Sequence, residues 1–196
     1  YDVNFLSVVK AALTDGAGFV ILPDVFTELA DRLLPSLDAG KMQKLGRWDG
    51  FGAHTKDSIF NTAPEIVELV DQPIVSLIVQ SLLGWDCKID NLAASTSRIA
   101  PDNYALGPHQ DSPFEQNPGC PLPPAEYPLV VQTIIAFDAF TESNGPLYVV
   151  PHSHKKRQRV NLPWSGNTPK GPIPNDAMKV VVPKGSAILA IGHIWH

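Results

Sequence analysis

Hydrophobic positions in the first third of the chain recur with the 3.6-residue period of amphipathic helices. Residues 4–13 and 25–37 carry such stripes, and a short apolar strand is expected between them at 19–22. A third stripe covers 64–84 and is broken at Pro73, because proline ends one helix but suits the first turn of the next. This part of the chain is therefore predicted to be helical apart from one strand.

After residue 84 the pattern changes to short apolar runs between prolines and glycines, which is typical of sheets with tight connections. The expected strands are, in chain order, residues 90–100, 128–138, 146–151, 178–183 and 186–191. Two connections, 112–128 and 160–177, are long enough to be functional loops rather than turns. The pattern as a whole predicts a mainly β protein with N-terminal helices, of the α+β class.

Composition narrows the class of protein. The chain has 196 residues, of which 44% are hydrophobic and 18% charged, so it can bury one core, and its length favours a single domain spanning residues 1–196. The net charge of −5 gives no electrostatic reason to expect a nucleic-acid or membrane partner. The basic run at 155–159 is interpreted as a solvated loop rather than an anion site.

The chain carries two cysteines, Cys87 and Cys120, which argues against a disulfide framework. It shows no signal-peptide pattern and no apolar stretch of the roughly 18 residues that a membrane span needs. We therefore expect an intracellular location, in the cytoplasm or alternatively in the peroxisome. Because the sequence runs from Tyr1, not a methionine, to His196, we also expect that the domain lacks its C-terminal end.

His109 and Asp111 are the first candidates for metal ligands. They stand two positions apart, so in an extended segment both side chains point to one face. An imidazole and a carboxylate belong to the facial two-histidine, one-carboxylate arrangement, which leaves open positions on iron(II) for a co-substrate and O2. A histidine and an aspartate at this spacing also arise by chance and are often no more than a hydrogen-bonded pair, so the pattern needs context.

Further motifs supply that context. Residues 144–154, NGPLYVVPHSH, resemble the NGxLxxxPGSH stretch of the phytanoyl-CoA dioxygenase family of iron(II)- and 2-oxoglutarate-dependent oxygenases. Residues 185–191, GSAILAI, resemble the strand that leads to the family's distal metal-binding histidine. The segments 16–23, GAGFVILP, and 82–84, LLG, resemble other landmarks, so the resemblance covers nearly the whole chain.

The resemblance implies a ligand set. In the family the distal histidine comes eleven positions after the glycine, and here Gly185 is followed at that distance by His196. The implied ligands of iron(II) are therefore His109, Asp111 and His196, and His193 is not one of them.

The resemblance also implies a fold and a reaction. The fold is a double-stranded β-helix, a jelly-roll or cupin-like barrel, with the N-terminal helices packed on its outside. The reaction is the oxidative decarboxylation of the co-substrate 2-oxoglutarate with O2 to succinate and CO2, coupled to oxidation of an unactivated C–H bond of a small-molecule substrate. Because Asp111 is present, hydroxylation is expected rather than halogenation. Desaturation, epimerisation and ring formation remain alternatives at the same site.

Contacts with the co-substrate and the substrate are less specified. The resemblance implies a basic residue, usually arginine, roughly ten residues after the distal histidine and thus past residue 196. A bidentate guanidinium suits the distal carboxylate of 2-oxoglutarate. Gln132 falls at a cavity-facing position and binds the co-substrate if the strand register matches the family, and otherwise it is a polar residue on the outer face. Phe114, Tyr127 and Trp195 are candidates for lining the pocket, with ordinary core packing as the alternative.

One rival metal site has to be weighed. His152 and His154, together with His193 or His196, would suit zinc in a jelly-roll binding module without turnover. We favour instead a turn in which these histidines are structural. His152 replaces the glycine of the family stretch, so strain is expected if the turn needs a positive φ there. His54 is interpreted as a surface or lid residue.

Overall fold

The structure is a computed structural model that describes residues 3–37, 47–48, 52–56, 64–90, 92–97, 108–111, 121–160, 164–165, 168–169 and 172–196. Its α-helices are α1 (Val3–Thr14), α2 (Thr27–Leu33), α5 (Val67–Val70) and α6 (Pro73–Leu83). Short 3-10 turns are η1 (Leu34–Leu37), η2 (Pro64–Ile66) and η3 (Ser153–Lys156). The three predicted helical segments and the break at Pro73 are thereby confirmed.

Local sequence explains where these helices begin and end. The side-chain Oε1 of Gln72 accepts hydrogen bonds from the backbone N–H groups of Ile74 and Val75, at 2.8 and 3.1 Å, and so caps α6. Pro73 occupies the first turn of α6, where its missing N–H costs nothing. Gly84 ends α6 with a φ of 97°, a conformation that suits glycine.

The strands pair in antiparallel fashion. Those that overlap predicted segments are β1 (Phe19–Leu22), β4 (Ala93–Ser97), β5 (Val131–Ile135), β6 (Leu147–Val149), β9 (Met178–Val180) and β10 (Ala187–Ile191). Four short strands were not predicted, namely β2 (Arg47–Trp48), β3 (Gly52–Lys56), β7 (Trp164–Ser165) and β8 (Thr168–Pro169). The described strands form sheets in the orders β1-β10-β5, β2-β3-β4, β6-β9 and β7-β8.

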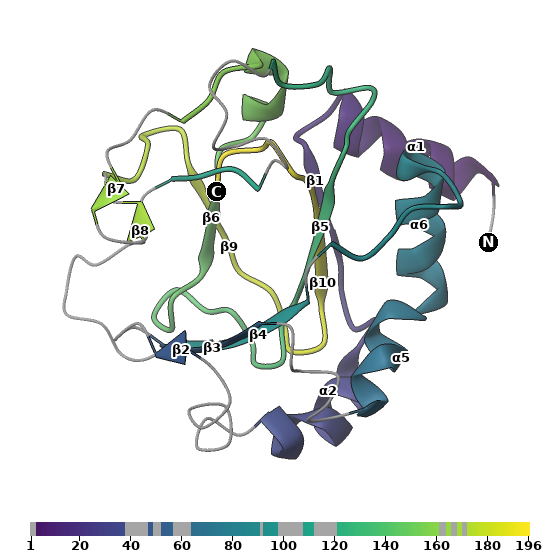
Figure 1. Cartoon of the computed structure of the whole chain (residues 1–196), viewed down its shortest axis with the longest axis vertical. Helices are drawn as coiled ribbons and strands as arrows, with labels where there is room; N and C mark the ends of the chain where they lie inside the picture. Colours follow the sequence, from purple (N-terminus) through teal and green to yellow (C-terminus); the bar gives the residue numbers. More distant parts are fainter. Residues whose placement is uncertain are drawn as a thin grey trace.

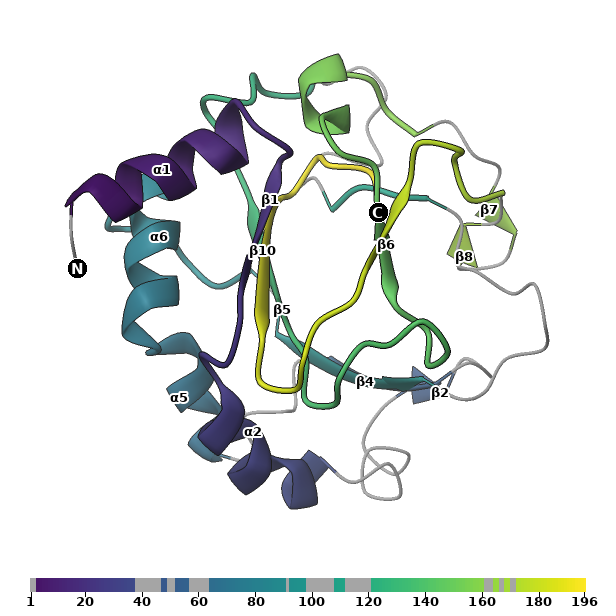
Figure 2. The same ribbon diagram turned by 180° about the vertical axis from the view of Figure 1, so that it is seen from behind.

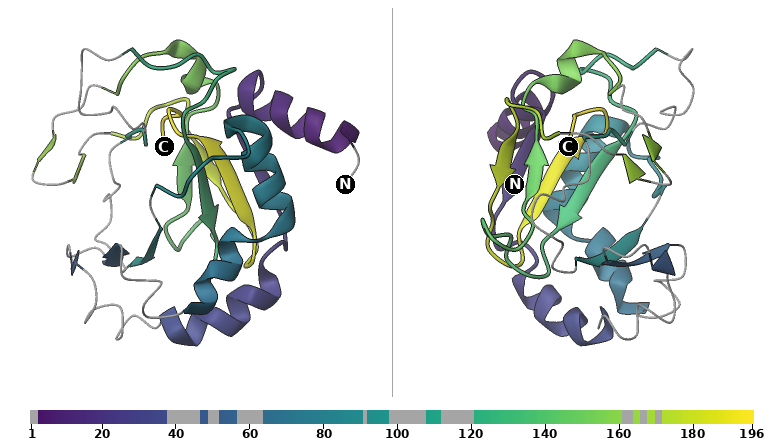
Figure 3. Two further views of the ribbon diagram at one scale, coloured as in Figure 1. Left: turned by 45° about the vertical axis from the view of Figure 1, so that its right-hand side comes forward. Right: turned by 90° about the vertical axis from the view of Figure 1, so that its left-hand side faces the viewer.

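The β1-β10-β5 sheet lies in the middle of the molecule. Helices α1, α6, α5 and α2 cover one of its faces, and the β6-β9 pair lies across the other (Figures 1 and 2). The β7-β8 pair stands on the side of the molecule away from α1 and α6 (Figure 3). The result is a layer of helices outside an assembly of antiparallel strands. Among the described residues, the hydrogen bonding does not close these sheets into one continuous barrel.

Strand β10 is buried on both faces, which explains why its sequence is apolar throughout. Ala187, Leu189 and Ile191 belong to the core between the sheet and the helices. Ile188 and Ala190 belong to a second core between the sheet and the β6-β9 pair. A strand that is covered on both faces has a continuous run of hydrophobic residues and not an alternation of hydrophobic and polar ones. The predicted strand at 186–191 is thereby confirmed, with one residue fewer.

No helix in the described ranges is both long enough and apolar enough to cross a membrane. This agrees with the lack of a long apolar stretch in the sequence.

His152, which stands where the resembling stretch has a glycine, adopts the positive φ at which strain was expected. His152 precedes η3 with φ 64° and ψ 0°, in the left-handed region, and its backbone N–H donates to the Ala17 oxygen at 2.9 Å. A side chain with a Cβ is disfavoured there by roughly 1 to 2 kcal/mol. The strain expected at this turn is therefore present.

Replacing His152 with glycine should stabilise the protein by about 0.5 to 1 kcal/mol, since relief of the left-handed backbone outweighs the extra freedom of glycine in the unfolded chain. Urea unfolding would measure the shift in midpoint at unchanged slope. His152→Ala is the matched control, because alanine keeps the Cβ and should give no gain. Equal stabilisation by alanine and glycine would show that the histidine side chain, and not the backbone, is the source of strain.

Candidate metal centre

The structure brings together the three residues proposed as ligands. One donor atom from each of His109, Asp111 and His196 lies within 4.8 Å of the others. Within the described part of the chain, this is the one group of three or more histidine, cysteine, aspartate or glutamate side chains with such spacing. The imidazole rings of His109 and His196 lie 4.3 Å apart between centroids, tilted by 50°.

Backbone pairing holds the two histidines together. The N–H of His109 donates to the His196 oxygen at 2.9 Å, and the N–H of His196 donates to the His109 oxygen at 3.0 Å. This reciprocal pair fixes the two main chains as neighbours in an antiparallel ladder. Asp111 stands two residues beyond His109, so its side chain can share the face of the histidine ring. Main-chain hydrogen bonds therefore bring the two histidines to the same place.

The hydrogen bonds of His196 decide which nitrogen faces the centre. Its Nδ1 lies 3.2 Å from the backbone oxygen of Ile194, an acceptor, so Nδ1 carries the proton and donates. Its Nε2 lies 3.4 Å from Oδ2 of Asp111. A ring fixed through one nitrogen presents the other as a ligand, which is how metal-binding histidines are commonly oriented.

The centre is closed on one side and open on the other. The side chain of His196 is 5% exposed, whereas that of Asp111 is 41% exposed. A ligand can therefore approach from the side of the carboxylate.

Gln132 holds the Asp111 carboxylate from the inner face of the central sheet. On β5 it pairs with Ala190, so its side chain points into the core that faces β6 and β9, away from the helices. Its Nε2 donates to Oδ2 of Asp111. In this register Gln132 lies on the inner face of the sheet. The predicted contact of Gln132 with 2-oxoglutarate stays a prediction.

The electrostatics of Asp111 favour its anionic form. Partial burial alone would raise the pKa of this carboxyl, but its interactions with the imidazoles of His196 and His109 outweigh the effect of burial. The amide of Gln132 adds to this effect, so the pKa of Asp111 lies below its ordinary value.

Gly192 is a contributor that the sequence reasoning missed. A Cβ placed on it would lie 2.6 Å from the backbone oxygen of Asp111 and 2.7 Å from Cβ of Val130. Its N–H donates to the oxygen of Val130 at 2.9 Å, which holds it in this position. A glycine just past a buried strand is a known signal of close backbone approach, and here the approaching chain carries Asp111, the carboxylate proposed as a metal ligand.

The histidines of the rival zinc site form a different environment. His154 is fully buried, and its Nε2 lies 3.0 Å from the oxygen of Thr14. Its ring centroid is 6.2 Å from that of His193, which is also buried. Burial lowers the pKa of both groups, that of His193 to about 4. Neither joins a three-ligand group among the described residues, which supports a structural role for both.

The structure gives different information on each of the residues proposed to line the pocket. Trp195 donates from Nε1 to the oxygen of Gln158 at 3.2 Å and lies under the Lys156 ammonium, 5.0 Å from the ring centroid. Its ring contacts therefore give no support to a place in the pocket. Tyr127 is 75% exposed and is not a core residue. Phe114 and the side chain of His54 lie outside the described residues.

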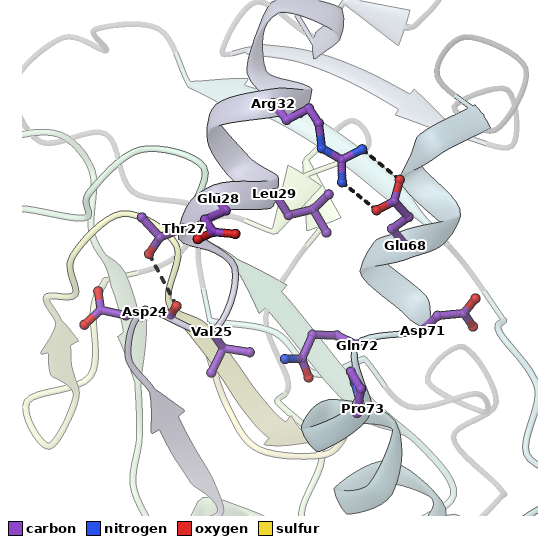
Figure 4. A pocket seen from close by; sticks show the side chains of 10 residues that line it. All are labelled: Asp24, Val25, Thr27, Glu28, Leu29, Arg32, Glu68, Asp71, Gln72 and Pro73. Atoms are coloured by element: carbon purple, nitrogen blue, oxygen red, sulfur yellow. Dashed lines mark hydrogen bonds and ion pairs between the residues drawn. The ribbon is translucent and has the colours of Figure 1, made fainter.

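A surface groove elsewhere on the molecule shares no residue with this centre. It has a volume of about 740 Å³ and lies between α2 and the start of α6 (Figure 4). Arg32 crosses it to make two hydrogen bonds with Glu68, at 2.8 and 2.5 Å. Its lining residues are Asp24, Val25, Thr27, Glu28, Leu29, Arg32, Glu68, Asp71, Gln72 and Pro73. The ion pair is exposed on both sides and contributes little to stability.

Two imidazoles and one carboxylate that converge from paired backbone segments define the class of non-haem iron centres with a facial ligand set. Residues 15–196 match the phytanoyl-CoA dioxygenase (PhyH) family. The chain belongs to this family, and it is accordingly a non-haem enzyme that depends on iron(II), 2-oxoglutarate and O2.

Two solved structures show a similar fold. One is SnoN, a non-haem α-ketoglutarate-dependent epimerase from nogalamycin biosynthesis, with a TM-score of 0.67 and 18% identity over 99% of this chain and 76% of that one. The other is SnoN in complex with Fe3+, α-ketoglutarate and nogalamycin RO, with a TM-score of 0.64 and 17% identity over 99% of this chain and 77% of that one. At this identity the likeness shows a shared fold.

Proposed function

We propose that His109, Asp111 and His196 hold iron(II), and that the enzyme oxidises an unactivated C–H bond of a small-molecule metabolite while 2-oxoglutarate is converted to succinate and CO2. The observation that carries the proposal is the convergence of the three donor atoms within 4.8 Å of one another.

The donor set fits the metal. Two imidazole nitrogens and one anionic carboxylate oxygen match the ligands of non-haem iron(II), and three facial ligands leave adjacent positions for a chelating 2-oxo acid and O2. The partly exposed side of Asp111 supports access to those positions. Bound there, the iron would supply the redox chemistry that couples decarboxylation of 2-oxoglutarate to oxidation of the substrate.

Neighbouring residues of the chain orient the side chains of the proposed ligands. The Nδ1–H of His196, fixed on Ile194, turns Nε2 toward the centre. The amide of Gln132 donates to Oδ2 of Asp111, the same oxygen that lies 3.4 Å from Nε2 of His196, and so fixes the orientation of the carboxylate. We further propose that the antiparallel sheets belong to one double-stranded β-helix barrel within a single domain. The fold shared with SnoN supports this arrangement.

Epimerisation is a second candidate outcome at the same site. SnoN is described as an epimerase, and the two chains share a fold over almost all of this chain. Hydroxylation and epimerisation both begin with removal of hydrogen from carbon, and they differ in what the carbon receives afterwards. Mass spectrometry of the product separates them. Hydroxylation adds one oxygen atom, about 16 mass units, to the substrate, whereas epimerisation leaves its mass unchanged.

The proposal is tested without knowing the substrate. Full-length protein mixed anaerobically with iron(II) and 2-oxoglutarate should develop a visible charge-transfer band, because the 2-oxo acid chelates through two adjacent open positions. Zinc in place of iron is the control and should give no band. Admitting O2 should then produce succinate slowly even without substrate. Absence of the band at saturating iron and co-substrate, with zinc held in a closed tetrahedral site, would favour a binding module instead.

A further inference from the structure

Gln110 lies between the proposed ligands His109 and Asp111 in the chain, but its side chain lies in a different environment from theirs. In an extended segment, the side chain between His109 and Asp111 points away from the face that those two share. Gln110 is 2% exposed. A buried primary amide is costly unless its donors and acceptor are hydrogen bonded, so its partners indicate what it does.

Each polar atom of the Gln110 amide has a backbone partner. Its Nε2 donates to the oxygen of His193 at 2.8 Å and to the oxygen of Gln158 at 3.1 Å. Its Oε1 accepts from the N–H of Val160 at 3.1 Å. Two carbonyl groups face the NH2 group and one N–H faces the amide oxygen, so this orientation of the amide is fixed. In the flipped orientation the amide oxygen would face the two carbonyl oxygens.

These bonds tie the first ligand pair to the segment that carries the third ligand. His193 lies three residues before His196 in the chain. The oxygen of Gln158 also accepts from Nε1 of Trp195, the residue next to His196, at 3.2 Å. The side chain of Gln110 therefore holds the terminal segment at a second place, in addition to the backbone pair between His109 and His196.

Two attachments restrict motion that one attachment permits. A single backbone pair between the two segments opposes rotation less than two attachments do, and such a rotation would change the distance between the carboxylate and the distal imidazole. A second attachment at Gln110, on the opposite face of the same extended segment, opposes that rotation. The Gln110 amide is thus placed to set the relation of Asp111 to His196 before any metal arrives.

We propose that Gln110 is a positioning residue that presets the geometry of the metal centre through its three backbone hydrogen bonds. The inference rests on the proposed function, because it concerns the affinity of the same three ligands for a metal. Outer partners that orient metal ligands typically change metal affinity roughly 10- to 100-fold when they are removed.

The test uses Gln110→Met, which keeps the length and approximate volume of the side chain but removes its hydrogen bonds. Gln110→Asn is a milder second variant, which keeps the amide but shortens its reach. The matched control is Gln80→Met, the same chemical change at an exposed position of α6. Metal affinity is measured with Co(II) alone, whose visible absorption reports binding and geometry without turnover, beside thermal unfolding of each metal-free protein.

Gln110→Met is expected to bind Co(II) roughly 10- to 100-fold more weakly than the wild type while folded, with an altered visible spectrum, and Gln110→Asn should show a smaller loss. Gln80→Met should match the wild type. Co(II) affinity within twofold of the wild type in Gln110→Met, accompanied only by a lower unfolding temperature, would overturn the inference in favour of a structural role. Failure of both variants to fold would overturn it too. A wild type that binds Co(II) no better than Asp111→Ala would instead refute the proposed function.

Discussion

Replacing Asp111 with alanine is expected to abolish the formation of succinate from 2-oxoglutarate. Asp111 is the one anionic donor among the three grouped side chains, and its pKa is held below the ordinary value, so it contributes the charge that retains a divalent ion. The loss of metal affinity should exceed the roughly 10- to 100-fold that removal of an outer partner causes. Iron titration and succinate measurement on the purified variant provide the check.

The two histidines near the end of the sequence give this prediction its control. His196→Ala should lose the metal as Asp111→Ala does, because its Nε2 faces the carboxylate. His193→Ala should keep metal binding, at some cost in stability, because His193 is buried beside His154 and is not in the ligand group. If His193→Ala eliminated the metal and His196→Ala did not, the assignment of the distal ligand would be wrong.

Gly185→Ala should destabilise the fold by about 2 to 5 kcal/mol, because steric overlap adds to an unfavourable backbone conformation. Gly185 has a φ of 81°, and a Cβ on it would lie 2.5 Å from both N and Cα of Thr27. The residue cannot move aside easily, since its N–H donates to the Ala136 oxygen and its own oxygen accepts from Phe26, both at 2.7 Å. Urea unfolding of the metal-free variant measures the loss.

Gly145→Ala separates the two contributions. Gly145 has nearly the same φ, 82°, but a Cβ there would meet nothing within 4 Å. Its replacement should therefore cost only about 1 to 2 kcal/mol, the penalty of the backbone conformation. If the two substitutions cost the same, the contact between Gly185 and Thr27 would not be a rigid one.

The parts of the fold that the sequence predicted are those with a strong local signal. Helix α6 has a proline at its start, a glycine at its end and a periodic apolar stripe between them, so its bounds of Pro73–Leu83 agree with the expected ones. Strand β10 has a run of apolar residues short enough to be a strand and is bounded by glycines. In both cases burial follows directly from the order of residue types.

The strands that were missed lack such a signal. Strand β3, GAHTK, has no alternation of apolar and polar residues, and its pairing with β4 could be found only in three dimensions. The Asp49-Gly50 dipeptide between β2 and β3 is the one hairpin signal that the sequence offers for this pair. Strands β7 and β8 have two residues each, too few for any periodicity.

The site shows the same division. His109, Asp111 and His196 were identified as the proposed ligands through a resemblance in motif order, and the structure brings their side chains together. The supporting contacts could not be predicted in this way. Gln110 acts on carbonyl groups at 158 and 193, and Gly192 matters because the backbone of Asp111 packs against it. Such contacts depend on which distant segments the fold brings together.

The reciprocal backbone pair between His109 and His196 has a consequence for how the protein is made. Residues 109 and 196 are 87 positions apart, so a ribosome adding about 5 to 20 residues per second needs roughly 4 to 17 s to pass from one to the other. During that interval the emerging chain carries an imidazole and a carboxylate without their third partner. A centre built from all three proposed ligands can therefore form only after the distal histidine has been synthesised.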